Sequence, residues 1–503
     1  MIIGVVTLIP MIMVAFYPSE LNFMWAFLVT GLCSGVIGFL LWFLFIRKRL
    51  TNPLSHNQDA VLIVCIWIIA VLVSAIPWAT SGIPGMHYGN AIFEMTSGFT
   101  TTGATTLDAD STAKIFLLHR TIIQAIGGIG LILVISTAFL KSSGMKLYSA
   151  EGHGEMIIPN LAKTARTIVL FYLGFITIGT IAFLFTGMNF FESFGFAVSC
   201  ISTGGFSVVT GNIAHYNNIA VELIAMTLML IGGLNFYIHL FIIKGKFKKI
   251  VFDRETTVFV ITCLLLPLMV GLLLTPQIAT IDPLLPVNNY GDALRYSSFM
   301  VISATTTTGL QNVSDIAAFP QGLLAILSFL CILGGSSGST AGGIKTFRVI
   351  VIVKGMFYNL TERFGNKRIV TSHFIKRYGE DEEITPRLFT SSVSYAVLYV
   401  SVILFGTLVF SIANGDAAGY GGFGQSFFEA ASLTSSMGLT VAGYSFTDNI
   451  WIAMCATLLM FLGRLEIVPV FNAITRGSKD AIHFVQDQRR KKRASRLSDF
   501  NPQ

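Results

Sequence analysis

Runs of about 20 apolar residues recur along the whole chain, and this feature limits the possible folds more than any other. The hydrocarbon core of a bilayer is about 30 Å thick, so a helix of about 20 apolar residues is long enough to cross it. Charged residues make up 12% of the 503 residues, whereas a soluble globular chain has about 25%. The sequence therefore predicts an all-α integral membrane protein, because a backbone in lipid must satisfy its own hydrogen bonds.

Ten runs are long and apolar enough to be spans, and one of them is interrupted by a stretch of small residues. Shorter amphiphilic stretches lie between several runs, and we predict re-entrant helices there because these stretches cannot cross. The uninterrupted runs are 2–17, 21–46, 60–80, 116–140, 167–186, 219–243, 256–275, 388–412 and 450–471, and the interrupted one is 322–333 with 344–358. The predicted re-entrant helices are 88–98, 190–201, 291–305 and 424–434.

Lysine and arginine fall almost entirely on one side of these predicted spans. Segments 187–218 and 413–449 contain neither residue, whereas segment 345–387 and the tail 476–503 are rich in both. Cytoplasmic loops of membrane proteins carry an excess of Lys and Arg, so we predict that both termini are cytoplasmic. The net charge of +7 then reflects topology, and nucleic acid is not an expected partner. The basic stretch Arg489–Arg496 suits either anionic lipid or an acidic surface of a regulatory partner.

One pattern occurs four times along the chain: an apolar span, a short helix, a turn of Thr, Ser and Gly, and a second span. Such internal repetition is typical of a repeat architecture, and all four turns lie on the side poor in Lys and Arg. We predict four tandem span–pore-helix–span repeats around a pseudo-four-fold central pore, plus two extra N-terminal spans, about ten spans in all. Setting Gly103, Gly204, Gly309 and Gly438 in register places a phenylalanine ten residues before each, at Phe93, Phe194, Phe299 and Phe428.

The four turns have the composition of an ion-selectivity filter. Glycine permits backbone conformations that turn carbonyl oxygens inward, and a ring of carbonyls can replace the hydration shell of a cation. Irregular backbone at membrane depth is tolerated only where it is buried in protein or lines a water-filled cavity. The alternative is that the turns simply cap outer loops. The predicted ion-binding residues are Thr101, Thr102, Gly103, Ser202, Thr203, Gly204, Thr307, Thr308, Gly309, Ser436, Met437 and Gly438.

Two glutamates, Glu94 and Glu429, stand nine residues before a filter glycine, and Glu192 lies near the second turn. Carboxylates at these positions are expected either to concentrate cations at the outer mouth or to be helix-start charges stabilised by the helix dipole.

Four such units in one chain, each with a filter glycine, resemble the Trk/Ktr/HKT superfamily of potassium transporters. The two N-terminal spans and the run Gly463–Glu466 are similar to its TrkH branch. The resemblance implies a potassium-transporting homodimer docked on a cytoplasmic nucleotide-binding ring of the TrkA type. In this superfamily a serine in place of the first filter glycine goes with sodium permeation. Here Gly103, Gly204, Gly309 and Gly438 are all present, which favours potassium. Met437 stands where the other aligned turns have threonine, which leaves the strictness of selectivity open.

Ten consecutive small residues interrupt one span. Such a run is a poor helix interior, and in a membrane it must be sheltered by protein. It resembles the intramembrane loop that acts as a gate in the superfamily, and the resemblance also implies that Arg464 lies close to this loop. The alternatives are a glycine-rich helix contact for the run and pairing with Glu466 for Arg464. The predicted gate residues are Gly334, Gly335, Ser336, Ser337, Gly338, Gly342, Gly343, Lys345 and Arg464.

These patterns divide the chain into six predicted parts. Residues 1–52 form an N-terminal two-span domain, and the last part, 476–503, is the basic cytoplasmic tail. The four pore repeats are 53–145, 146–248, 249–380, which holds the broken span and the gate loop, and 381–475.

The sequence thus predicts potassium uptake across a bacterial inner membrane rather than an enzyme activity. Potassium is the expected substrate, held by filter carbonyls; no covalent cofactor is expected, and a nucleotide is expected only on the partner subunit. A secondary transporter of another solute would have inverted repeats, whereas these four all begin from the basic side. A membrane-embedded enzyme would need converging His, Asp or Cys residues within the spans, which the sequence lacks. A sodium-permeable or proton-coupled member of the same superfamily is the remaining alternative.

Overall fold

The computed structural model describes most of the chain. The described residues are 1–46, 58–83, 85–130, 161–275, 290–313, 316, 319–364, 373–414, 422–441, 446 and 449–475. The predicted basic tail, and the last ten residues of the predicted span 116–140, lie outside these ranges.

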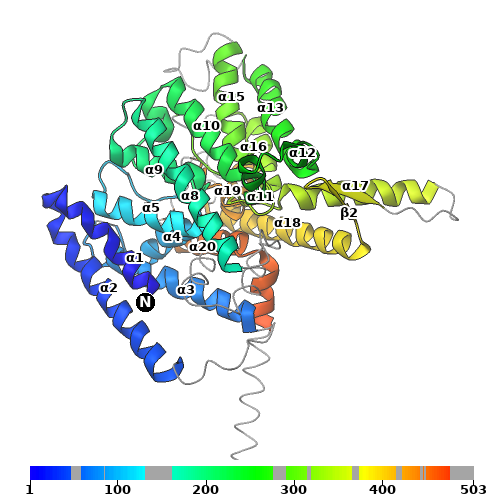
Figure 1. The fold of residues 1–503 in the computed structure, drawn as a ribbon. Helices are drawn as coiled ribbons and strands as arrows, with labels where there is room; N and C mark the ends of the chain where they lie inside the picture. The colour runs from blue at the N-terminus through cyan, green and yellow to red at the C-terminus, as the bar shows by residue number, and fades with distance from the viewer. Residues whose placement is uncertain are drawn as a thin grey trace, which may run out of the picture.

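The N-terminal segment forms two antiparallel arms along one flank of the helical body (Figure 1). The first arm is α1 (Ile2–Leu8) with η1 (Ile9–Ala15), and the second, after η2 (Pro18–Glu20), is α2 (Leu21–Leu41) with η3 (Trp42–Ile46). Gly4 and Gly31 bring the arms together, because a β carbon on Gly4 would lie 2.7 Å from the Gly31 carbonyl oxygen. The arms are anchored by Glu20, whose buried carboxylate accepts hydrogen bonds from the amides of Lys114 and Ile115 at 2.6 and 2.8 Å.

Four units of similar design follow. The first contains α3 (Gln58–Ala79), α4 (Tyr88–Phe99) and α5 (Lys114–Ile129). The second contains α8 (Leu161–Leu184), α9 (Phe190–Ile201), η4 (Asn212–Tyr216), α10 (Ile219–Gly233), α11 (Phe236–Ile243) and α12 (Phe247–Val251). The third contains α13 (Arg254–Leu274), α15 (Tyr290–Thr305), α16 (Gln321–Leu333) and α17 (Thr346–Phe364). The fourth, after β1 (Phe374–Arg377) and β2 (Glu380–Glu383), contains α18 (Pro386–Asn414), α19 (Phe423–Thr434) and α20 (Ile450–Arg464), and a helix over Ile467–Thr475 follows it.

In each unit one helix of 12 or 16 residues packs between the helices before and after it. These short helices are α4, α9, α15 and α19, and each contacts the helices before and after it in its own unit. Contacts between units pair α5 with α9, α10 with α15, α16 with α19 and α20 with α4. The fourth unit therefore meets the first, and the four short helices are brought around a common centre (Figure 1).

The described residues include five helices long and apolar enough to cross a membrane, or seven if two bent helix pairs each count as one span. The protein is therefore a multi-pass membrane protein. The predicted break between 322–333 and 344–358 is present, because α16 ends at Leu333 and α17 begins at Thr346.

Two runs predicted to be continuous spans, 219–243 and 450–471, are instead bent by 104°. In the first, Asn235 caps α11 by accepting the Tyr237 amide at 2.8 Å. The carbonyl groups of Gly232 and Gly233, freed by the bend, accept backbone hydrogen bonds from the 334–345 segment at 3.3 and 3.1 Å. The sequence did not predict these bends because both runs are apolar throughout, and hydropathy carries no information on where the backbone hydrogen bonds of a helix are interrupted.

The all-α prediction also missed a two-stranded hairpin, β1–β2, on the side of the molecule where α17 lies (Figure 1). Its two-residue turn is Tyr378-Gly379, with φ of 51° and 80°. A tight hairpin turn of this kind requires positive φ at both positions, which glycine adopts readily. Most residues of the two strands are charged, so the strands lack the alternating apolar pattern from which a β-strand is predicted.

We expect the Glu20→Ala protein to be less stable by about 1 kcal/mol, because the first amides of α5 lose a buried anionic cap. The measurement is the free energy of unfolding of the purified protein, or its melting temperature in detergent. Glu380→Ala is the matched control. Glu380 is 81% exposed in its ion pair with Lys249, and exposed ion pairs contribute little to the free energy of unfolding. Equal losses in both variants would contradict the capping role.

Candidate functional site

Each of the four short helices ends in a turn of the same backbone shape. The residues that cap the helix C-termini are Thr100, Ser202, Thr306 and Ser435. The next residue in each turn has a positive φ although it is not glycine: 53° at Thr101, 49° at Thr203, 52° at Thr307 and 59° at Ser436. Two residues further on comes a glycine with positive φ: 84° at Gly103, 73° at Gly205, 78° at Gly309 and 74° at Gly438.

The second turn is therefore shifted by one residue from the predicted register, and Gly205, not Gly204, matches the other three glycines. A shared hydrogen bond fixes this register: the amides of Thr102, Gly204, Thr308 and Met437 donate to the carbonyls of Ser97, Ser199, Ser303 and Ser432 at 2.8–2.9 Å. The phenylalanine alignment was wrong at Phe194 for the same reason. A serine six residues before the glycine occurs in all four repeats and is the sequence signal that would have given the correct register.

The four turns lie against one another in a closed ring. A β carbon built on Gly103 would lie 2.4 Å from the carbonyl oxygen of Gly204, and one on Gly205 would lie 2.4 Å from that of Thr308. A β carbon built on Gly309 would lie 1.6 Å from the carbonyl oxygen of Met437, and one on Gly438 would lie 1.8 Å from that of Thr102. Each glycine thus faces a carbonyl of the next turn, and the fourth turn closes onto the first.

Side chains in the ring alternate around it. In the first turn the hydroxyls of Thr100 and Thr102 lie 2.8 Å apart, and in the third those of Thr306 and Thr308 lie 2.7 Å apart. The second turn has Gly204 at the corresponding place, and the fourth has the fully buried Met437. The asymmetry expected at Met437 alone therefore involves two turns, which lie opposite each other.

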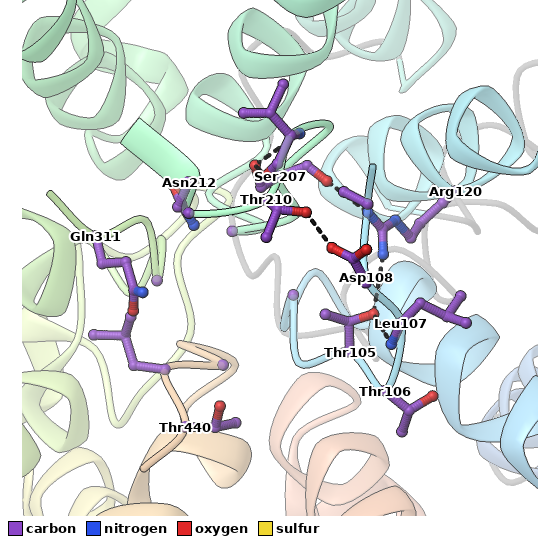
Figure 2. A pocket seen from close by; sticks show the side chains of 18 of the residues that line it. Thr105, Thr106, Leu107, Asp108, Arg120, Ser207, Thr210, Asn212, Gln311 and Thr440 are labelled. Atoms are coloured by element: carbon purple, nitrogen blue, oxygen red, sulfur yellow. Dashed lines mark hydrogen bonds between the residues drawn. The ribbon is translucent and has the colours of Figure 1, made fainter. Parts of the chain in front are cut away.

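A cavity of about 640 Å³ opens onto the ring (Figure 2). All four positive-φ glycines line it, together with residues that follow them in each turn. Asp108 also lines the cavity, and the hydrogen bond from the Thr210 hydroxyl lowers the pKa of its carboxyl group, so this side chain stays anionic. The other polar residues at the cavity wall are Thr105, Thr106, Arg120, Ser207, Asn212, Gln311 and Thr440.

The glycine-rich segment 334–345 lies at the opposite end of the ring from this cavity. It contacts residues that precede the glycines: the Gly342 amide donates to the Thr307 hydroxyl at 2.7 Å, and the Thr340 hydroxyl donates to the Ile201 carbonyl at 3.1 Å. A β carbon on Gly342 would lie 1.9 Å from the carbonyl oxygen of Ser435. The segment therefore touches three of the four turns, and the predicted residues Gly334 to Lys345 are all within it.

Arg464, at the end of α20, holds this segment from below the ring. One guanidinium nitrogen donates to the Thr340 carbonyl at 2.8 Å, and another donates to the Gly127 carbonyl at the end of α5. The Glu466 carboxylate accepts two hydrogen bonds from Arg348, both at 2.9 Å. Lys345, with φ of 78°, donates to the Ala341 carbonyl within the segment. The structure thus brings Arg464 and the glycine-rich segment together, as the resemblance implied.

Glu94 and Glu429 occupy neither of the positions expected for them. Both lie in the middle of a short helix and are fully buried, so they are not helix-start charges and do not line the cavity. Each accepts a hydrogen bond from the amide twelve residues later: Thr106 to Glu94 at 2.6 Å and Val441 to Glu429 at 3.2 Å. They support the backbone that follows the glycine. Glu192 does lie in the first turn of its helix, α9.

Comparison with known proteins gives consistent results over nearly the whole chain. The family model described as TrkH, cation transport protein, matches residues 24–483. An uncharacterized cation transporter of Methanocaldococcus jannaschii is 30% identical, over 93% of this chain and 92% of the relative. The Trk system potassium uptake protein TrkG of Escherichia coli is also 30% identical, over 92% of each chain. The crystal structure of the potassium transporter TrkH from Vibrio parahaemolyticus superposes with a TM-score of 0.77 at 24% identity, covering 94% of this chain and 97% of the other.

We expect Gly309→Ala to destabilise the protein by about 2 kcal/mol or more, because alanine there combines a positive φ with overlap against a buried carbonyl. The check is the melting temperature of the purified protein in detergent. Gly89→Ala is the control, since a β carbon at Gly89 meets no atom within 4 Å. If Gly309→Ala and Gly89→Ala have the same melting temperature, the ring is not packed as described.

Proposed function

The chain belongs to the TrkH family of cation transport proteins, and on this premise we propose that it is the pore-forming subunit of a potassium uptake system. The observation that carries the proposal is the closed ring, in which each glycine faces a carbonyl oxygen of the next turn. Relatives of similar length are named potassium uptake proteins of the Trk system.

The proposed selectivity filter consists of the four turns. Their backbone carbonyls would replace the water around a dehydrated K⁺, with the ion as substrate and no covalent cofactor. The ends of four helices support this role, because the negative end of each helix dipole favours a cation nearby. The order of the four units around the ring supports the architecture of four span–pore-helix–span repeats about one pore.

The glycine-rich segment is the proposed gate. It contacts three turns of the ring and is tethered to α5 and α20 through Arg464. Opening would require the segment to leave the ring, and this needs the hydrogen bonds of Arg464 and of Thr340 to break together. Glycines at positions 334, 338 and 343, all with positive φ, allow such a rearrangement of the backbone.

A cytoplasmic nucleotide-binding subunit of the TrkA type is the proposed regulator, and the hairpin offers a route from it to the gate. At the hairpin turn, the Tyr378 hydroxyl accepts a hydrogen bond from the Asn235 amide group at 2.7 Å. The same amide nitrogen donates to the Ser337 carbonyl, and the Ser337 amide donates to Glu255. A force applied to the hairpin would therefore reach the gate through Asn235, and also through β1, where the Arg377 guanidinium lies 4.0 Å from the centroid of the Phe347 ring at the start of α17.

In the cell we propose a homodimer in the bacterial inner membrane with both termini in the cytoplasm. The exposed apolar faces of α2, α13 and α18 suit contact with lipid or with a second copy. A sodium-permeable or proton-coupled transporter of the same family is the second candidate. The observation that favours it is the absence of a hydroxyl at Gly204 and Met437, which leaves two turns without the Thr–Thr contact.

We expect purified protein in liposomes to take up K⁺ and Rb⁺ at least about ten-fold faster than Na⁺ and Li⁺ under the same driving force, because carbonyl ligation favours the larger ions. Isotope uptake measures this directly. Uptake of Na⁺ equal to or faster than K⁺ would leave the fold intact and support the second candidate.

Arg464→Ala is expected to raise the basal K⁺ flux several-fold, because the proposed gate loses its tether to α5 and α20. The measurement is flux into liposomes without any partner subunit. Arg387→Ala, at the exposed start of α18, is the control. Unchanged flux from a correctly folded Arg464→Ala protein would refute the gating role, and a misfolded one would indicate a structural role.

A further inference from the structure

The buried side chain of Arg120 joins two neighbouring turns at the cavity wall. It extends from α5 and is 2% exposed. One guanidinium nitrogen donates to the Thr105 hydroxyl at 3.0 Å, and the other donates to the Ser207 carbonyl at 2.5 Å (Figure 2). Thr105 and Ser207 each lie two residues after the positive-φ glycine of their turn, so the guanidinium bridges equivalent positions of the first and second turns.

The charge of Arg120 is balanced within the protein. Glu94 lies 3.8 Å away, and the guanidinium stacks over the Phe206 ring with 4.2 Å to its centroid. Glu94 itself accepts hydrogen bonds from the Thr105 hydroxyl and from the Thr106 amide and hydroxyl, at 2.9, 2.6 and 3.0 Å. A cation entering the cavity therefore meets a neutral pair rather than an isolated positive charge.

This arrangement departs from the repeat. The carboxylate that accepts a later amide recurs at Glu429 in the fourth unit. Gly127 of α5 and Gly463 of α20 each face the carbonyl of the residue before the turn. Seven residues before these glycines stand Arg120 and Ala456, so the fourth unit has no guanidinium at this position. The guanidinium is therefore an addition to the junction between the first and second turns. Its two nitrogens have a fixed separation, because the guanidinium is planar and rigid, so it can set the distance between the two backbone segments.

We propose that Arg120 is a positioning residue for ion selectivity, and that its guanidinium fixes the spacing between the first and second turns of the ring. Selectivity by a carbonyl ring depends on the number and placement of its oxygens, so a change of spacing alters the preference among ions more than it alters total flux. Glu94 has a separate task, which is to neutralise the guanidinium so that cations can pass. The inference rests on the proposed filter.

The test uses the full-length chain in liposomes and the ratio of Rb⁺ to Na⁺ uptake. Arg120→Lys keeps the charge but replaces the two-pronged donor with a single ammonium group. We expect the ratio to fall about five-fold, the effect of losing one net hydrogen bond, while Rb⁺ uptake changes less. Lys114→Arg is the matched control: it exchanges the same residue types on the same helix, away from both turns, and should leave the ratio unchanged.

Glu94→Gln separates charge from position. The amide oxygen still accepts the hydrogen bonds from Thr105 and Thr106, but the guanidinium is left uncompensated, so Rb⁺ and Na⁺ uptake should fall by the same factor. If the ratio falls as much in Glu94→Gln as in Arg120→Lys, selectivity follows local charge and the proposal is wrong.

Thr105→Val provides a second test that does not depend on the folding of an arginine variant. It removes the hydroxyl that accepts from Arg120 and leaves all charges in place, so the ratio should fall, by less than in Arg120→Lys. An unchanged ratio in either folded variant overturns the proposal. A native protein that transports no cation, or shows no preference for Rb⁺ over Na⁺, would instead refute the proposed filter.

Discussion

The close approach of each ring glycine to a carbonyl oxygen of the next turn is the constraint on which the rest of the structure depends. Positive φ at the glycine turns its carbonyl and that of its neighbour in the required directions, and the missing β carbon lets the adjacent backbone come within contact distance. Any larger residue would push two turns apart and open the ring. The short helices, and the long helices around them, hold four irregular segments in this arrangement where the bilayer provides no water.

Irregular backbone inside the membrane needs polar partners from the protein, and here these are side-chain hydroxyls, buried carboxylates and backbone carbonyls. Hydroxyl groups of Thr100 and Thr306 bond within their own turns, and buried carboxylates hold the backbone that leaves the ring. Below the ring, the glycine-rich segment uses the carbonyls released by the bend after Gly233. The bend and the segment therefore depend on each other, because the carbonyl groups that the bend frees accept hydrogen bonds from backbone amides of the segment.

Much of this site was predictable from sequence, and the failures have physical causes. Four turns, four short helices and an interrupted span follow from composition and repetition. The register of the second turn was missed because Gly204 and Gly205 are adjacent, and the backbone features that distinguish them, a positive φ at Gly205 and the hydrogen bond from the Gly204 amide to Ser199, are not visible in the composition of the turn. The bends at 233–236 and 464–467 and the hairpin were missed because they depend on long-range contacts. The role of Arg120 could not be inferred, since its partners Thr105 and Ser207 are distant in sequence.

A pore assembled from four identical subunits must repeat every substitution four times, but a single chain can vary each quarter of the ring alone. Here the first and third turns, with Thr102 and Thr308 directly before the glycine, face each other, and the second and fourth, with Gly204 and Met437 at that position, face each other across the other diagonal. The two diagonals of the ring therefore differ in polarity and polarisability, because one ends in threonine side chains and the other in a glycine and a thioether. The backbone of the ring thus repeats four times, whereas the side chains at these positions repeat only between the first and third turns.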